Sequence, residues 1–153
     1  MLFNVNGALV PRSQAVVNVF DSGFILGDGV WEGLRVHGGK VAFLQDHLDR
    51  LWEGAAALDI DIGLSQDELT ARLYETLKAN DMQDDVHIRL MLTRGLRSTP
   101  YQDPRMVVSK ATIVIAPEFK KANPDTAKNS LSLYTVSVRR GRSDVQDLSL
   151  IHI

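Results

Sequence analysis

One arginine in the middle of the chain has the side-chain type and the surroundings to hold an anion. Arg50 follows His47 by three residues in the segment FLQDHLDRL, and this spacing places both side chains on one face of a helix. A guanidinium group donates hydrogen bonds in a planar fork, so Arg50 could hold an anion, and Gly54 one turn later could leave room for it. The alternative is a solvated arginine close to Asp46 and Asp49.

A second set of cations lies on and just after a predicted strand. In HIRLMLTRGLR, His87 and Arg89 project from one face of that strand, and Arg94 and Arg97 follow at its end. Arginine on the face of a strand is unusual, and the pattern indicates an anionic ligand. The alternative is that these side chains lie on an open sheet face in contact with solvent.

The glycine-rich stretch DSGFILGDGVWEGLR, residues 21–35, does not have the spacing of a nucleotide-binding loop. The third glycine of G-x-G-x-x-G is missing, and a strand follows where a dinucleotide site needs the N-terminus of a helix. The glycines could instead allow positive φ in a turn that enters the strand. A third interpretation is that Gly33, on the same strand face as Trp31 and Arg35, leaves that face open for a ligand.

Composition and charge narrow the class of protein. The chain has 153 residues, of which 44% are hydrophobic and 24% charged, enough for one globular domain with a core. Its formal net charge of -2 gives no bulk attraction to nucleic acid or to an anionic membrane surface. The absence of cysteine excludes disulfides and thiolate metal sites and is consistent with a reducing cytoplasm. We expect no signal peptide, no bilayer-spanning helix and no metal site.

Hydrophobic periodicity predicts an α+β fold, in which an antiparallel sheet carries two helices on one face. The predicted strands cover 2–10 (a pair around Asn6-Gly7), 16–20, 30–43 (a hairpin turning at Gly38-Gly39), 85–95, 111–117 and 130–138. The predicted helices cover 44–59 and 65–79, and a capping box of Ser65 and Glu68 opens the second. Residues 96–107 and 118–129 are predicted loops.

The hairpin over 30–43 has a predicted orientation. We expect Trp31 and Arg35 on one side of it. We expect Val30, Leu34 and Val36 on the other side, facing the helices. Because side chains alternate along a strand, a register slip of one residue would expose all three aliphatic side chains.

Three segments of the chain together resemble class IV aminotransferases, which are pyridoxal-phosphate enzymes of fold type IV. The segment 21–51 matches the pattern D-x-G-F-x-x-G-D-G-V-[FYW]-E, then a glycine-containing turn, then F-L-x-x-H-L-x-R-L. The segments IRLMLTRG (88–95) and SVRRGRSDVQD (137–147) extend the similarity over nearly the whole chain. The resemblance implies that residues 1–147 are the N-terminal domain of such an enzyme.

The resemblance also gives roles to the candidate residues. It implies that Arg50, at the arginine of the H-L-x-R motif, binds the phosphate of pyridoxal 5'-phosphate. It implies that Trp31 lies where the family often has a tyrosine or phenylalanine in contact with the substrate. Arg35, Arg89 and Arg94 complete the expected substrate-binding set. From their places in the sequence, Arg89 on the strand face and the arginines of TRGLR, Arg94 and Arg97, could meet a substrate carboxylate.

The resemblance implies, in addition, what this chain lacks. In the family, the lysine that forms a Schiff base with the cofactor lies just after the segment matching 137–147, and no lysine follows it here. The acid partner of the ring nitrogen and most phosphate-binding loops belong to a C-terminal domain, which we expect to be absent. We expect the tail LSLIHI, 148–153, to be non-native, with a natural short strand as the alternative. We therefore expect the chain by itself to be inactive.

The expected activity of the complete enzyme is transamination between an amino acid and a 2-oxo acid, with branched-chain amino acids as the first expectation. Transamination of R-amines or D-amino acids, and aminodeoxychorismate lyase chemistry, stay open. The resemblance implies a cytoplasmic homodimer without nucleic-acid or membrane partners. The alternative from another class is a stand-alone binding domain without catalysis.

Overall fold

The computed structural model describes residues 1–121, 123–130 and 132–139. The chain divides into two compact units, Met1–Ala122 and Asn123–Ile153. In the second unit, the described residues contain one short helix, α4 (Asp125–Asn129), and no strand. The strand predicted over 130–138 is therefore not found among them. This segment has no described strand to pair with, and its side chains Leu133, Tyr134, Val136 and Val138 are exposed. The predicted tail at 148–153 lies outside the described residues.

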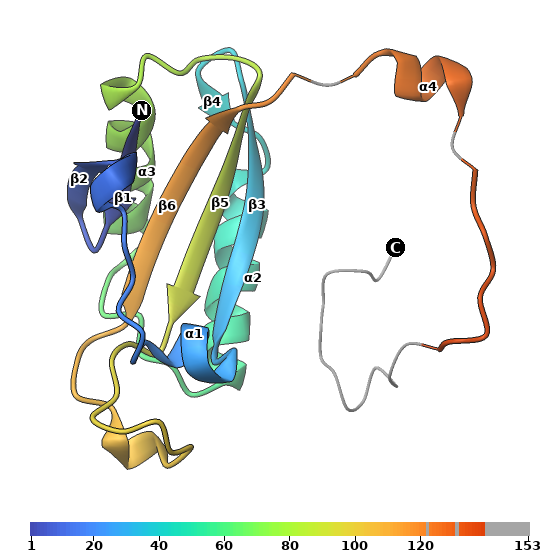
Figure 1. The fold of residues 1–153 in the computed structure, drawn as a ribbon. Coiled ribbons are helices and arrows are strands. Elements are labelled where there is room, and N and C mark those ends of the chain that lie inside the picture. The colour runs from blue at the N-terminus through green and yellow to red at the C-terminus, as the bar shows by residue number, and fades with distance from the viewer. Residues whose placement is uncertain (122, 131, 140–153) are drawn as a thin grey trace. The chain divides into compact units, whose positions relative to one another are not determined.

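The first unit is built on a six-stranded antiparallel sheet with the strand order β2-β1-β6-β5-β3-β4 (Figure 1). The strands are β1 (Leu2–Val5), β2 (Ala8–Pro11), β3 (Gly29–His37), β4 (Lys40–Val41), β5 (Val86–Thr93) and β6 (Thr112–Phe119). The helices are α1 (Ser22–Leu26), α2 (Leu44–Ala57) and α3 (Gln66–Ala79), with the single turns η1 (Arg12–Gln14) and η2 (Pro104–Met106). The predicted α+β class is confirmed.

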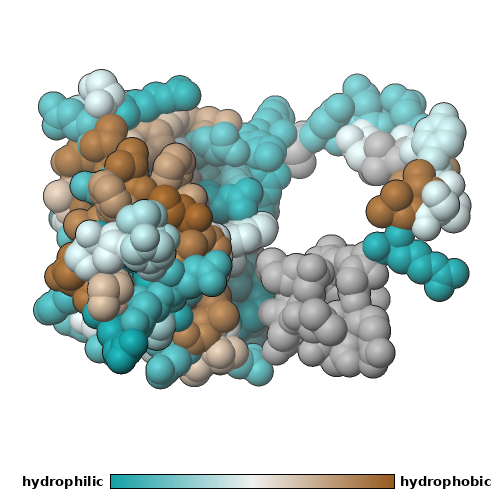
Figure 2. Space-filling view, turned by 60° about the horizontal axis from the view of Figure 1, so that its bottom comes forward, coloured by the Kyte–Doolittle hydropathy of each residue, from teal (hydrophilic) through white to brown (hydrophobic). Residues whose placement is uncertain are grey.

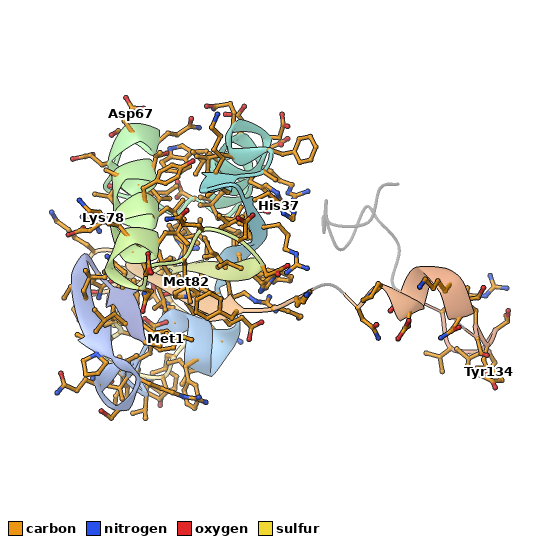
Figure 3. The ribbon with its side chains drawn as sticks, turned by 90° about the horizontal axis from the view of Figure 1, so that it is seen from above. Met1, His37, Asp67, Lys78, Met82 and Tyr134 are labelled. Atoms are coloured by element: carbon orange, nitrogen blue, oxygen red, sulfur yellow. The ribbon has the colours of Figure 1, made fainter. Side chains whose placement is uncertain are left out.

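Two amphipathic helices cover one face of the sheet. Figure 3 shows α3, from Asp67 to Lys78, lying beside α2 on the same side of the strands. The residues that the two helices bury are Leu48, Leu51 and Ala55 of α2 and Leu69, Leu73, Thr76 and Leu77 of α3. The predicted capping box is present, since Ser65 Oγ accepts from the Glu68 N–H at 3.2 Å and Glu68 Oε2 accepts from the Ser65 N–H at 2.8 Å. The core therefore lies between these helices and the sheet.

The strand β3 has the predicted orientation. Leu34 and Val36 are fully buried toward the helices, while Trp31 on the opposite side is 43% exposed. The predicted turn at Gly38-Gly39 forms with positive φ at both glycines, the conformation that a two-residue hairpin requires. The return strand is shorter than predicted, because β4 pairs only with Val36 and His37. The rest of β3 has no strand neighbour on that edge among the described residues.

A short helix, α1, lies where the sequence predicted only a turn. Asp21 caps it, because its Oδ1 accepts a hydrogen bond from the Gly23 N–H at 2.9 Å, and Gly27 ends it with a φ of 67°. Five residues are too few to show a helical period. The strand predicted just before it, over 16–20, is not formed. Its large apolar side chains find no neighbouring strand and stay exposed. Figure 2 shows a face of the first unit on which hydrophobic residues gather.

Candidate functional site

A buried carboxylate lies in the middle of β3. Glu32 falls on the same side of the strand as Leu34 and Val36, and only 2% of it is exposed. A carboxylate in that position needs charged or hydrogen-bonding partners, because burial removes its hydration. Sequence reasoning gave Glu32 no role. The sequence does contain a sign of this role, because Glu32 is the one charged residue on the apolar side of β3.

Two side chains of α2 supply those partners. Arg50 Nε donates to Glu32 Oε1 at 2.6 Å, and Arg50 Nη2 donates to Oε2 at 2.5 Å. His47 Nδ1 lies 2.7 Å from the same Oε2 and acts as the donor, since a carboxylate only accepts. Burial by itself would raise the pKa of Glu32, but the hydrogen bonds and charges of Arg50 and His47 outweigh it and lower that pKa. Glu32 is therefore an anion that fixes the guanidinium plane of Arg50.

Arg50 keeps the capacity to bind a second anion. Its side chain is 36% exposed, and its Nη1 makes no hydrogen bond to any residue that the structure describes. Its partner is Glu32, so neither Asp46 nor Asp49 holds it. Gly54 does not clear room for an anion as predicted. A Cβ there would lie 3.1 Å from Val30 Cγ1, so this glycine lets α2 pack closely against β3.

A second group of side chains lies on the sheet face opposite α2 and α3, which we call the open face. Arg89 of β5 is opposite Gly33 of β3 in the strand register, and its guanidinium carbon lies 3.8 Å from the centroid of the Trp31 ring. His87 Nε2 occupies the space over Gly33, where a Cβ would meet it at 3.3 Å. Burial, together with the positive charge of Lys120, lowers the pKa of His87.

These side chains line a broad cavity of about 1110 Å³. Trp31, His87 and Arg89 contribute its polar and aromatic wall, and Phe3, Met91 and Val114 contribute apolar surface. A cavity with an apolar wall and the basic residues Arg12, Arg89 and Lys120 in its lining suits a small acid with an aliphatic body. The structure thus brings Trp31 and Arg89 together, as the predicted substrate set requires.

The other predicted substrate residues do not line this cavity. Arg35 Nη1 donates to the Lys120 carbonyl at 2.7 Å. Arg94 is committed to four hydrogen bonds, two to Asp28 and one each to the carbonyls of Leu58 and Asp59. These bonds tie the turn before β3 to the C-terminal end of α2. Arg94 therefore has a structural role beside the site.

Arg97, which the sequence grouped with Arg94, is 3% exposed. Its Nε donates to the Tyr101 carbonyl at 3.0 Å, and its Nη2 donates to the Asp103 carbonyl. A buried arginine with carbonyl partners fixes the loop it lies under. Arg97 thus holds the connection between β5 and β6.

Replacing Arg94 with alanine should lower the free energy of unfolding by about 2–3 kcal/mol, because Asp28 loses two charge-assisted hydrogen bonds. Urea denaturation monitored by circular dichroism measures this change. The matched control is Arg105→Ala, which removes an exposed arginine paired with Asp103 and should leave the unfolding midpoint unchanged. Equal midpoints for Arg94→Ala and the parent chain would show that the four hydrogen bonds carry no stability.

Two absences hold for the part of the chain that the structure describes. No group of three or more histidine and acidic side chains there could hold a metal ion. No described helix has the length and apolar character that crossing a membrane requires.

Comparison with known proteins places this fold and site in one family. The fold resembles the crystal structure of branched-chain aminotransferase from Thermoproteus uzoniensis with norvaline, with a TM-score of 0.65 and 29% identity over 77% of this chain and 40% of that one. A putative branched-chain-amino-acid aminotransferase of Methanocaldococcus jannaschii is 39% identical over 95% of this chain and 49% of its own length. A D-alanine aminotransferase of Bacillus licheniformis is 31% identical over 96% of this chain and 51% of its own length.

The family model of amino-transferase class IV matches residues 29–148. The chain therefore belongs to the class IV aminotransferase family. It spans about half the length of the Methanocaldococcus jannaschii and Bacillus licheniformis relatives.

Proposed function

We propose that this chain is the amino-terminal part of a pyridoxal-phosphate-dependent class IV aminotransferase. The observation that carries the proposal is Arg50, which Glu32 and His47 hold in one orientation and whose Nη1 stays available. The Nε and Nη2 groups of Arg50 hold Glu32, and the remaining Nη1 can donate to a phosphate oxygen. In the complete enzyme, Arg50 anchors the cofactor phosphate, and Glu32 and His47 position Arg50.

The residues present fit pyridoxal 5'-phosphate. When bound, this cofactor supplies an aldehyde that takes the amino group of the substrate and a ring that accepts the electron pair released at the α-carbon. Arg50 approaches β3 from the helix side, while Trp31 and Arg89 lie on the opposite face of the sheet. The edge of β3 that lies between Arg50 and the Trp31–Arg89 pair has no strand neighbour among the described residues. In this proposal, one ligand extends around that edge to contact Arg50 and the pair.

The cavity on the open face takes the substrate in this proposal. Arg89 receives a carboxylate, and the apolar wall around Phe3, Met91 and Val114 receives an aliphatic side chain. Branched-chain amino acids and their 2-oxo acids fit this wall, and the branched-chain relative supports them. The D-alanine aminotransferase relative supports D-amino acids as the second candidate. We propose a structural role for Arg94, which makes four hydrogen bonds, and for Arg35, whose Nη1 donates to the Lys120 carbonyl.

The proposal requires a second half that supplies the Schiff-base lysine and further phosphate-binding groups. Following the resemblance, we propose that the complete enzyme is a cytoplasmic homodimer. Reading the source gene beyond the codon for Asp147 tests this requirement. The expected result is an open frame that encodes a lysine shortly after that codon. A stop codon there would instead favour a stand-alone binding domain.

A further inference from the structure

Arg89 is a cation without an anion partner in the part of the chain that the structure describes. It is half-buried on the open face of the sheet, and no described carboxylate lies within ion-pair distance of it. Glu118 on the neighbouring strand pairs with His87 and Lys120 instead. The contact that Arg89 does make is with the ring of Trp31, 3.8 Å from its guanidinium carbon to the ring centroid.

The strand register explains this contact. Arg89 is directly opposite Gly33, which has no side chain to hold it, and Trp31 is the diagonal neighbour two residues earlier on β3. The guanidinium can therefore lie flat across the strand onto the indole ring. A cation stacked on an aromatic face keeps the N–H groups at its edge available. Those groups border the cavity that both residues line.

We propose that Trp31 is a positioning residue, which holds the Arg89 guanidinium flat on the sheet so that its N–H edge receives a carboxylate in the open-face cavity. This inference rests on the proposed function and deepens it. Trp31 acts through Arg89, so its contribution is specific to ligands that carry a negative charge. A ligand of the same shape without the charge makes only an apolar contact with Trp31, which leucine can replace.

The test uses the whole chain and two probes of one shape, 4-methylvalerate and its neutral amide. Ligand-observed NMR measures the dissociation constant of each probe. Trp31→Leu should weaken binding of the acid by about fivefold to thirtyfold, the range for loss of a cation–π contact, and should leave the amide unchanged. Trp31→Phe keeps an aromatic face and should recover most of the acid affinity. Trp31 is partly exposed, so these variants should keep the parent melting temperature.

A double-mutant comparison separates positioning from direct contact. In an Arg89→Leu background, Trp31→Leu should have no further effect on the acid, because the group that Trp31 positions is gone. An equal loss for the acid and the amide, or an additional loss in the Arg89→Leu background, would show that Trp31 contacts the ligand itself and would overturn the proposal. Failure of the parent chain to prefer the acid would overturn it as well.

The outcome is separable from the proposed phosphate anchor. 4-Methylvalerate and its amide carry no phosphate group, so their binding reports on Trp31 and Arg89 and not on the phosphate anchor. If the acid binds as described but Arg50 has no role in phosphate binding, the proposed function fails and the role of Trp31 stands.

Discussion

Replacing Arg50 with leucine should lower the free energy of unfolding by about 2–3 kcal/mol and also weaken phosphate capture. The first effect arises because Glu32 would stay buried without its main partner, and removing one member of a buried ion pair costs about 3–5 kcal/mol. The expected loss of unfolding free energy is smaller for Arg50, because 36% of its side chain is exposed to solvent. The loss of a charged hydrogen-bonded contact to phosphate should weaken cofactor binding by about tenfold to a hundredfold.

A double variant separates the two effects. Glu32→Leu combined with Arg50→Leu replaces the ion pair by apolar side chains, and such replacements are often neutral for stability. The double variant should regain the free energy of unfolding measured by urea denaturation, yet still fail to bind phosphate. Arg72→Leu, an arginine on α3, is the control and should change neither property. A single Arg50→Leu variant as stable as the parent would contradict the ion-pair account.

Replacing Glu32 with glutamine should make the free energy of unfolding depend less steeply on pH in the acid range. Arg50 and His47 lower the pKa of Glu32 in the folded chain relative to its ordinary value of 4.5. Above that value both the folded and unfolded states are ionised, so the ion pair contributes fully. As the pH falls below it, the unfolded state takes up the proton first, and the contribution is lost until the pH has passed through the folded pKa.

The free energy of unfolding of the parent chain should therefore fall below about pH 4.5, and it should fall more steeply than that of Glu32→Gln. The difference in slope should reach up to about 1.4 kcal/mol per pH unit, the value for uptake of one proton. Denaturation midpoints between pH 3 and pH 7 measure the two slopes. Glu53→Gln, an exposed glutamate of α2, is the matched control and should keep the parent slope. Parallel curves for the parent and Glu32→Gln would mean that Glu32 has no lowered pKa.

The parts of the fold that the sequence predicted correctly are those with local signals. The alternation along β3 and β5, the Gly38-Gly39 turn and the capping box at Ser65 each involve neighbours in the chain. The segment 16–20 is rich in valine but has no strand beside it, and only the tertiary structure decides whether a partner exists. The same reason applies to the described residues of 130–138.

The candidate site was predicted in part for a related reason. The arginine at 50 was recognisable from its motif, but its partner Glu32 is 18 residues away and on another element. The period of two along β3 puts Glu32 on the buried side with Leu34 and Val36, but it does not show which residue neutralises the carboxylate. The hydrogen bonds of Arg94 were not predicted, because the sequence does not show that Asp28 and the end of α2 meet at its side chain.

The central claim is that Arg50 of this chain captures the cofactor phosphate, and phosphorus-31 NMR of pyridoxamine 5'-phosphate tests it most directly. The signal should shift and broaden with increasing concentrations of the parent chain, and pyridoxamine without the phosphate should not compete. The folded double variant with leucine at positions 32 and 50 should leave the signal of the free compound unchanged. An equal shift with the parent and with this double variant would contradict the account, because the phosphate would then bind without Arg50.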